Sequence, residues 1–277
     1  MTETRIGFIG GGNMARSLIG GLLASGHAAH DLLVSDPSPS ARQQLATLGP
    51  LTLTEHNDRV AEQADVLVLA VKPQAMAAVL EPLAPLLSRR RPLLISIAAG
   101  LSTAALARWA GPLPLVRCMP NTPALIGSGM SVLYATDAVD ETGRELASQI
   151  LAAAGAVSWI DREADMDAVT AVSGSGPAYF FHLMELMISA GVEQGLAPEQ
   201  ARALVLQTAL GAARMAAEQD EDPAVLRQQV TSPGGTTAAA LEVFSQGDLA
   251  ALVNRAVTAA ADRSRALAAE LSGEDRT

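Results

Sequence analysis

The sequence predicts an α/β protein in two parts, with a parallel sheet covered by helices in residues 1–160 and an all-helical part in residues 161–277. Three observations predict it. Short apolar runs alternate with helical patterns up to about residue 160, which is typical of βαβ units. From about Asp161 onwards the apolar residues follow a helical period, and no strand is expected there. A glycine-rich turn follows the first apolar run, where a helix begins.

The glycine turn is the first chemical signal. Residues 6–9 form a short apolar run, and Gly10, Gly12 and Ala15 follow it with the Gly-x-Gly-x-x-Ala spacing of a dinucleotide-binding turn. Gly10 permits the tight turn, Gly12 lets the backbone approach a pyrophosphate, and Ala15 keeps the helix near the sheet. Free amides and the helix dipole attract phosphate there. This predicts a Rossmann domain, and a glycine-rich turn that binds nothing is the alternative.

Seven further apolar runs are expected to complete the sheet. They lie at residues 32–35, 51–53, 66–71, 93–97, 115–119, 130–134 and 157–160. The continuous run 66–71 suits a central parallel strand that is covered on both faces. Lys72, the only lysine of the chain, follows this run directly. Because ligands lie outside the carboxyl ends of strands in an open α/β sheet, we expect Lys72 beside the nucleotide.

Asp36 leaves the cofactor preference open. It follows the second predicted strand, at the place where this fold puts the residue that meets the adenosine ribose. An acid there favours a 2′-hydroxyl and repels a 2′-phosphate, which indicates NAD. Ser38, Ser40 and Arg42 could instead form a hydroxyl-rich turn with a nearby cation that accepts the phosphate.

Composition and charge exclude several function classes. The formal net charge is −10, 49% of the residues are apolar, and no Lys/Arg-rich block is present. These features argue against nucleic acid or an anionic membrane as a partner. No apolar run approaches the roughly 20 residues that span a bilayer, and the first residues are polar. We therefore expect a globular protein of the cytoplasm.

Cysteine and acid usage indicates neither a disulfide framework nor a metal. Cys118 is the only cysteine and lies in an apolar strand-like run, so we expect a buried, inert thiol. Glu163, Asp165 and Asp167 are close in sequence, but acids in a first helical turn explain them. We expect no metal site.

One predicted helix of the second part is apolar on nearly every side. It covers residues 177–195, and further helices are expected to start at Pro198, Pro223 and Asp248. A helix of that kind must be buried all round, and about 110 residues would not cover it alone. Interlocking of two subunits is the natural solution, and a central helix in a monomeric bundle is the alternative.

Residues 231–237, Thr-Ser-Pro-Gly-Gly-Thr-Thr, form a second chemical centre. They join hydroxyls to a Pro-Gly-Gly turn directly before a helical run. Exposed amides at a helix start suit a small anion such as a carboxylate, and an ordinary Ser/Thr cap is the alternative. The related motif at residues 173–177, Ser-Gly-Ser-Gly-Pro, follows a helical segment, so a hydrolase elbow is disfavoured.

With these motifs the chain resembles the pyrroline-5-carboxylate reductases over nearly its whole length. The motifs that carry the resemblance lie at residues 7–15, 70–73, 117–123, 167–179 and 231–237. The resemblance implies a Rossmann domain and a helical domain that interlocks two subunits, with dimers assembling into larger rings. It also implies hydride transfer from NADPH or NADH to the C=N carbon of 1-pyrroline-5-carboxylate, which gives L-proline in the last step of proline biosynthesis.

The resemblance also implies roles for individual residues. The pyrophosphate would be held by Gly10, Gly11, Gly12, Asn13, Met14 and Ala15. The adenosine end would meet Ser35, Asp36 and Asn57, and the nicotinamide side would meet Ala70, Val71, Lys72, Pro73, Ala98 and Asn121. The substrate carboxylate would be clamped by Ser232, Gly234, Gly235, Thr236 and Thr237, and Thr237 would bond the ring nitrogen as the catalytic residue. Glu163 or Asp220 would stabilise the iminium charge.

This reaction needs little acid catalysis, since the substrate itself largely supplies the protonated imine. The main task is to bring the reacting carbons together in the right orientation. A 3-hydroxyacid dehydrogenase of the 6-phosphogluconate type would need a lysine on the long helix, and residues 177–195 contain none. A non-catalytic nucleotide sensor would bind cofactor without turnover, and the complete motif at residues 232–237 weighs against it.

Overall fold

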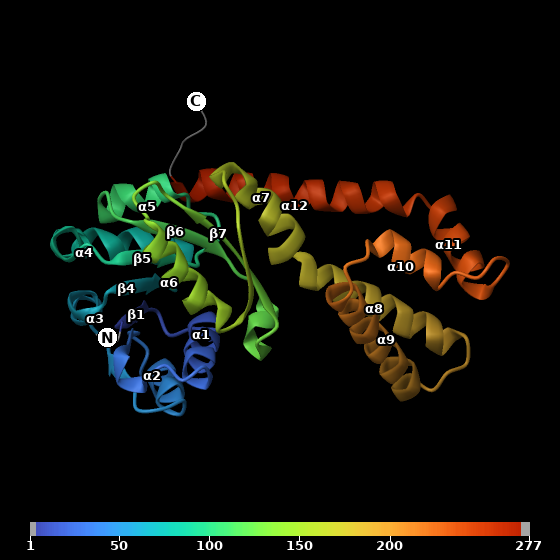
Figure 1. Cartoon of the computed structure of the whole chain (residues 1–277), viewed down its shortest axis with the longest axis horizontal. Helices are drawn as coiled ribbons and strands as arrows, with labels where there is room; N and C mark the ends of the chain where they lie inside the picture. The colour runs from blue at the N-terminus through green and yellow to red at the C-terminus, as the bar shows by residue number, and fades with distance from the viewer. Residues whose placement is uncertain (1–3, 273–277) are drawn as a thin grey trace. The chain divides into compact units, whose positions relative to one another are not determined.

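The computed structural model describes residues 4–272, and its contacts divide the chain into two compact units. The sheet unit comprises the described residues up to Ser175 together with those from Ala260 onwards, and the helical unit is Gly176–Ala259 (Figure 1). Each unit is described by itself. The boundary between a nucleotide domain and a dimerisation domain, expected at residue 160, stays a prediction.

The sheet unit is built on a single eight-stranded sheet within the described residues, in the order β3-β2-β1-β4-β5-β6-β7-β8. The strands are β1 (Ile6–Ile9), β2 (Leu32–Ser35), β3 (Thr52–Thr54), β4 (Val66–Leu69), β5 (Leu93–Ser96), β6 (Leu115–Met119), β7 (Gly129–Ala135) and β8 (Gly155–Trp159). All neighbours are parallel except β6 and β7, which are antiparallel. The eight apolar runs of the sequence each gave a strand, although β4, β5 and β8 end before the runs do.

Helices cover both faces of this sheet. On one face lie α1 (Asn13–Ala24), α2 (Pro39–Ala46) and α6 (Glu141–Ala152), and on the other lie α3 (Asn57–Gln63), α4 (Met76–Arg90) and α5 (Thr103–Ala110). The strand β4 contacts the cores on both faces. Val66 and Val68 belong to the first core, Leu67 and Leu69 belong to the second, and all four are fully buried. A strand buried on both faces is expected to be a nearly continuous apolar run, as predicted for residues 66–71.

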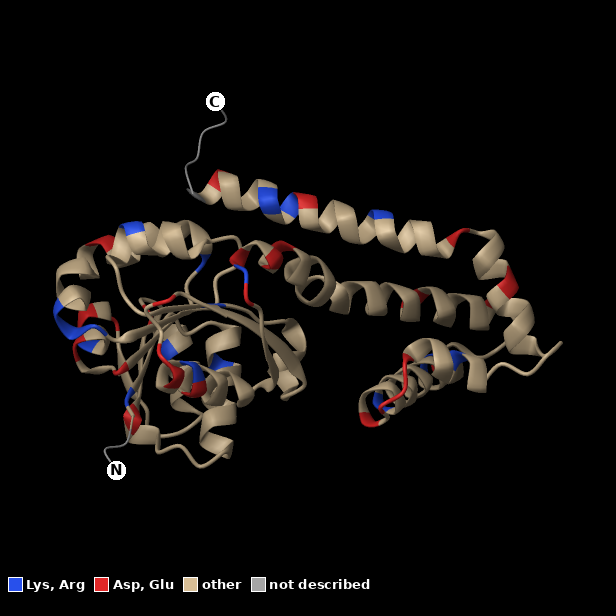
Figure 2. Ribbon diagram, turned by 45° about the horizontal axis from the view of Figure 1, so that its top comes forward, with Lys and Arg blue, Asp and Glu red and all other residues tan. Residues whose placement is uncertain are grey.

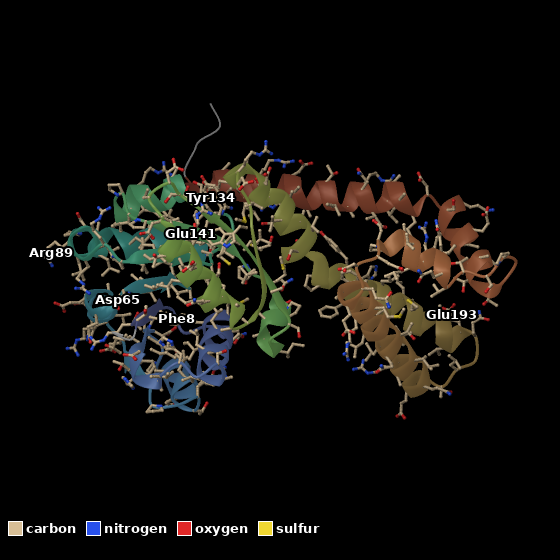
Figure 3. The ribbon with its side chains drawn as sticks, viewed as in Figure 1. Phe8, Asp65, Arg89, Tyr134, Glu141 and Glu193 are labelled. Carbon is tan, nitrogen blue, oxygen red and sulfur yellow. The ribbon has the colours of Figure 1, made fainter. Side chains whose placement is uncertain are left out.

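The core of the first face contains Phe8, labelled in Figure 3. Phe8 lies on β1 and is fully buried. Burial of such a side chain stabilises the fold by roughly 1.5–3 kcal/mol relative to leaving it exposed. The cores on both faces thus hold β1 and β4 rigidly, and these strands carry the loops of the site at their carboxyl ends.

The described chain beyond β8 is helical, as predicted. It contains α7 (Met166–Val169), a π-helical turn (Thr170–Gly174), α8 (Gly176–Glu193), α9 (Pro198–Glu218), α10 (Pro223–Gln229), α11 (Thr236–Gln246) and α12 (Leu249–Ser272). Short 3-10 turns lie at Ala29–Asp31, Pro73–Ala75, Thr122–Ile126 and Glu163–Asp165. Pro198 and Pro223 occupy first helical positions, where proline loses no hydrogen bond. The two other predicted starts, Pro177 and Asp248, lie within one residue of a helix start.

The apolar helix α8 is not buried by its own chain. Phe180 and Phe181 are each 63% exposed, and Leu186 is 53% exposed. Its charged residues are Glu185 and Glu193, so most of the helix is uncharged in Figure 2. The alternative of a central helix in a monomeric bundle is therefore wrong, because a bundle core would enclose these side chains. Large exposed apolar surfaces of this kind mark protein interfaces.

Among the residues that the structure describes, no helix has the length and apolar character that crossing a membrane requires.

Candidate active site

The glycine turn lies at the carboxyl end of β1, between β2 and β4. Gly10 has a φ of +99°, and a Cβ at this position would lie 2.7 Å from the carbonyl oxygen of Ala70. Its amide donates to the carbonyl of Ser35 at 2.8 Å, and the amide of Ala70 donates to the carbonyl of Ile9 at 2.8 Å. Only glycine fits here without strain, since the conformation and the close approach both exclude a side chain.

The turn leads into α1 without a side-chain cap. Gly12 is the N-cap residue, makes no side-chain cap bond, and has no atom within 4 Å of where a Cβ would be. The first intrahelical bond is donated by Arg16 to the carbonyl of Gly12, so the amides of Asn13, Met14 and Ala15 have no partner within the helix. Amides without an intrahelical partner at a positive helix end, next to the open space at Gly12, fit the pyrophosphate of a dinucleotide.

Asp36 follows β2 and faces back into the glycine turn. One carboxylate oxygen accepts a hydrogen bond from the amide of Gly11 at 2.8 Å, and the other accepts one from the amide of Ser38 at 2.8 Å. The hydroxyl of Ser35 is fully buried and donates to the carbonyl of Phe8 at 3.4 Å, whereas Asn57 lies half-buried at the start of α3. Ser35, one of the three residues predicted for the adenosine end, therefore has a buried side chain that bonds the neighbouring strand.

The residues predicted for the nicotinamide side follow three neighbouring strands. Ala70, Val71, Lys72 and Pro73 follow β4, Ala98 follows β5, and Asn121 follows β6. Since β4 pairs with β5 and β5 with β6, all parallel, their carboxyl ends share one edge of the sheet. Lys72 is exposed there and Ala98 is buried. The tertiary structure therefore places these loops next to one another, at the edge where open α/β sheets bind ligands.

The side chain of Asn121 is used to join three segments. Its Nδ2 donates to the carbonyl of Ser173 at 3.2 Å and lies 3.3 Å from the Ser173 hydroxyl, while its Oδ1 accepts from the amide of Met130 at 2.8 Å. Beside it, a Cβ on Gly174 would lie 2.4 Å from the Cε atom of Met119. Glycine at position 174 permits this close approach, and the π-helical turn Thr170–Gly174 brings the segment to the end of β6.

Glu163 is engaged in a hydrogen-bond network within the sheet unit. Its carboxylate accepts from the Thr103 amide at 2.7 Å, from the Thr103 hydroxyl at 2.6 Å and from the buried Arg117 guanidinium at 2.9 Å. Local sequence patterns do not predict Thr103 or Arg117 as partners of Glu163, because they are 60 and 46 residues away. The positive charge of Arg117 balances the charge of Glu163.

The two acids that follow Glu163 also have protein partners. Asp165 pairs with Arg162 on the surface, and the hydrogen bond from Arg162 lowers the pKa of the Asp165 carboxyl. Asp167 accepts a hydrogen bond from the hydroxyl of Ser264 at 2.6 Å, which ties α7 to the end of α12. The first contact is local to the segment before α7, and the second joins two helices.

The second glycine segment forms a tight turn before α11. Gly234 has a φ of +70°, and the amide of Gly235 donates to the carbonyl of Ser232 at 3.0 Å. Gly235 is the N-cap residue and makes no side-chain cap bond, so the ordinary Ser/Thr cap considered as an alternative is not formed. Thr236 and Thr237 occupy the first turn of α11. Asp220 lies exposed between α9 and α10.

Cys118 is buried on β6, as predicted for an inert thiol. Burial raises the pKa of the thiol to about 12, although a hydrogen bond with Ser131 acts in the opposite direction. A neutral thiol is a poor nucleophile at physiological pH.

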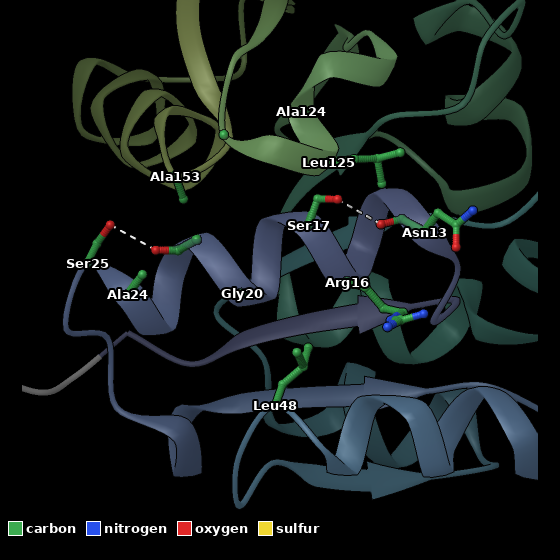
Figure 4. Close-up of a pocket in the computed structure, with 12 residues that line it drawn as sticks. Asn13, Arg16, Ser17, Gly20, Ala24, Ser25, Leu48, Ala124, Leu125 and Ala153 are labelled. Carbon is green, nitrogen blue, oxygen red and sulfur yellow. Dashed lines mark hydrogen bonds between the residues drawn. The ribbon is translucent and has the colours of Figure 1, made fainter. Parts of the chain in front are cut away.

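A cavity of about 620 Å³ lies along the flank of α1 (Figure 4). It is lined by Arg16, Ser17 and Ala24 of α1, and by Ala124 and Leu125 of the turn after β6. Of the predicted cofactor residues, only Asn13 lines it. The cavity therefore meets the predicted cofactor residues only at the start of α1.

Two family models and several curated proteins match this chain. The chain matches the family model described as pyrroline-5-carboxylate reductase dimerisation over residues 163–267, and the one described as NADP oxidoreductase, coenzyme F420-dependent, over residues 5–100. The pyrroline-5-carboxylate reductase of Pseudomonas aeruginosa is 52% identical over 272 residues, which are 98% of this chain and 99% of that protein. The relative from Pisum sativum is 40% identical over 95% of each chain.

Solved structures of pyrroline carboxylate reductases are also similar to this chain. A pyrroline-5-carboxylate reductase from Coxiella burnetii superposes with a TM-score of 0.93 at 41% identity, covering 96% of this chain and 99% of its own. The Plasmodium falciparum pyrroline carboxylate reductase, solved with NADP bound, gives a TM-score of 0.83 at 33% identity, covering 97% and 99%.

Proposed function

Because the chain belongs to the pyrroline-5-carboxylate reductase family, we propose that it reduces 1-pyrroline-5-carboxylate to L-proline with NADPH or NADH, the last step of proline biosynthesis. The structural observation that carries the proposal is a pair of uncapped helix starts. Both α1 and α11 begin after a glycine N-cap that makes no side-chain bond. One start suits the pyrophosphate of the cofactor and the other suits the carboxylate of the substrate.

The sheet unit supplies the residues for the cofactor. We assign the pyrophosphate to residues 10–15, where the amides at the start of α1 are unpaired within the helix. The nicotinamide is assigned to the loops after β4, β5 and β6, with Lys72, Ala98 and Asn121 among them. When bound, NAD(P)H supplies the hydride that reduces the imine carbon.

The segment 231–237 is assigned to the substrate. Its glycines, Gly234 and Gly235, leave the amides at the start of α11 without a side-chain cap, and these amides would hold the substrate carboxylate together with Ser232 and Thr236. The hydroxyl of Thr237, in the first turn of α11, would accept a hydrogen bond from the N–H of the iminium or donate one to the neutral ring nitrogen.

The two acids expected near the iminium differ in what their carboxylates do. Glu163 already faces the positive charge of Arg117 and bonds Thr103, so we assign it a positioning role at the start of α5. Asp220 is exposed, and it remains our candidate for electrostatic stabilisation of the iminium.

The family match to a dimerisation domain supports a homo-oligomer. We propose a homodimer that forms through the exposed apolar face of α8 and assembles further into a larger homo-oligomer in the cytoplasm. Sedimentation of the full chain would give its mass in solution, and a monomer at micromolar concentration would contradict this assembly.

Oxidation of NADPH and NADH by the purified chain, with DL-pyrroline-5-carboxylate as acceptor, tests the activity. We expect turnover that depends on the substrate and yields proline, detected by the fall in nicotinamide absorbance and by amino-acid analysis. Folded protein that binds nucleotide and turns over with neither cofactor would overturn the proposal.

A further inference from the structure

The direction of the Asp36 side chain bears on which cofactor the chain prefers. A carboxylate that selects NADH accepts a hydrogen bond from the ribose 2′-hydroxyl and repels a 2′-phosphate. In this chain the oxygens accept hydrogen bonds from two main-chain amides, those of Gly11 and Ser38, each at 2.8 Å. The bond to Gly11 spans 25 residues and joins the end of β2 to the glycine turn.

The packing around Gly11 leaves this carboxylate in place. A Cβ on Gly11 would lie 3.4 Å from the Oδ2 atom of Asp36 and 2.6 Å from the Cδ1 atom of Leu45. The carboxylate therefore rests on the bare backbone of the turn, and the charge of Asp36 is stabilised by two amide dipoles.

A cation lies directly beside Asp36. The Nη1 atom of Arg42 donates to the main-chain carbonyl of Asp36 at 2.5 Å, and its Nη2 atom lies 3.7 Å from the Oε2 atom of Glu55. Arginine has five N–H donors, so these contacts leave donors available for a bidentate phosphate contact. The side chain of Arg42 is 23% exposed, which keeps it accessible while its position is held.

Two hydroxyls stand on the same turn. The Oγ atoms of Ser38 and Ser40 are 2.9 Å apart, and Ser38 is the N-cap residue of α2. Arg42 lies on α2, four residues beyond Ser38, and its amide bonds the Ser38 carbonyl. Guanidinium and hydroxyl groups are therefore gathered at the end of β2, and the acid that would repel a phosphate is turned towards the glycine loop.

We propose that Asp36 is a positioning residue that holds the Gly11 amide in the dinucleotide turn, and that Arg42, with the hydroxyls of Ser38 and Ser40, gives the chain its preference for NADPH. This inference rests on the proposed use of a nicotinamide dinucleotide. It concerns the adenosine end of the cofactor alone, so it can be tested without the imine substrate.

The first test compares two fragments by titration calorimetry on the full chain. Adenosine 2′,5′-bisphosphate carries the 2′-phosphate and 5′-AMP lacks it. We expect the bisphosphate to bind at least about tenfold more tightly than 5′-AMP. Arg42→Ala should reduce this ratio of affinities to within about twofold of one, because a charge-assisted phosphate contact is lost. Arg89→Ala removes the same charge from the last turn of α4 (Figure 3) and should leave the ratio unchanged. A wild-type ratio of one or less, or a ratio that survives Arg42→Ala, would overturn the proposal.

The second test separates the two roles of Asp36. Asp36→Asn places an N–H donor against one of the two amides, so both fragments should bind more weakly by similar factors. Gly11→Ala should do the same without a change of charge, because its Cβ would collide with Leu45. If Asp36 were instead a ribose ligand that selects NADH, Asp36→Asn would shift the affinity ratio about tenfold or more towards the bisphosphate.

Steady-state kinetics complete the test and distinguish it from the proposed reductase activity. Arg42→Ala should raise KM for NADPH with little change in KM for NADH or in kcat. If the reductase assay fails while the fragments bind as described, the proposed function is wrong and the assignment of the adenosine site stands. If turnover is normal and the fragment ratio is one, the assignment of Arg42 is wrong. Thermal unfolding of each variant shows whether it is folded.

Discussion

The guanidinium of Arg117, on β6, lies 2.9 Å from the carboxylate of Glu163, in the segment before α7. The same carboxylate accepts two hydrogen bonds from Thr103, the first residue of α5. Three parts of the sheet unit that are distant in sequence are therefore joined through one side chain. Because the side chain of Arg117 is only 8% exposed, its charge depends on this partner.

Glu163→Ala should lower the free energy of unfolding by about 3 kcal/mol, because it leaves the buried Arg117 guanidinium without its counter-ion. Urea denaturation followed by the fluorescence of Trp109 and Trp159, both in the sheet unit, would measure it. Glu141→Ala, at the exposed first turn of α6, is the control, and should cost less than about 1 kcal/mol. Equal losses of unfolding free energy in the two variants would show that the Glu163–Arg117 pair stabilises the fold no more than an exposed acid does.

Thr237→Ala should lower kcat/KM for the imine by about tenfold to a hundredfold, because one hydrogen bond to a charged ring nitrogen is lost. Nucleotide binding, measured by calorimetry without substrate, should survive. Thr237→Ser keeps the hydroxyl and should restore most of the activity. A parallel loss of turnover and nucleotide affinity would contradict the role assigned to this hydroxyl.

Phe181→Glu should weaken the homo-oligomer, because it puts a charge on the exposed apolar surface of α8 that we expect the partner subunit to cover. Analytical ultracentrifugation should show a smaller mean mass for this variant than for the wild type. The control is Ala78→Glu, which adds the same charge at an exposed position on α4 in the sheet unit. An unchanged mass for Phe181→Glu would place the interface elsewhere.

Cys118 should make the chain less stable in alkali. Its pKa is about 12 in the folded chain against an ordinary value of 9.0, so between these pH values the folded state binds more protons than the unfolded state. The free energy of unfolding should therefore fall as pH rises from 9 towards 12. Denaturation midpoints at several pH values would show the fall, and Cys118→Ala should have a shallower dependence. Below pH 9 the two proteins should respond to pH alike, and the native thiol should resist aromatic disulfide reagents.

Local patterns in the sequence predicted elements that depend on nearby residues. The apolar runs at 32–35 and 115–119 match β2 and β6 residue for residue, because a strand buried on both faces is mostly apolar. Ser35 and Arg117 are the polar exceptions, and each is buried with a hydrogen-bond partner. Prolines marked the starts of α9 and α10, because proline is favoured in a first turn. The glycine spacing predicted the tight turn after β1, since glycine tolerates the positive φ that position 10 adopts. The family resemblance carried the rest of the functional assignment.

Tertiary structure alone decided what the polar side chains contact. The sequence places Asp36 at the end of β2, but only the folded chain shows that its carboxylate turns to the Gly11 amide. Likewise, no local sequence pattern predicts that Glu163 pairs with Arg117 or that Asn121 bonds Ser173. Apolar periodicity reports which face is buried and glycine reports local backbone geometry. The partner of a hydrogen-bonding group depends on which distant strands become neighbours, and that order is set by the packing of the whole sheet.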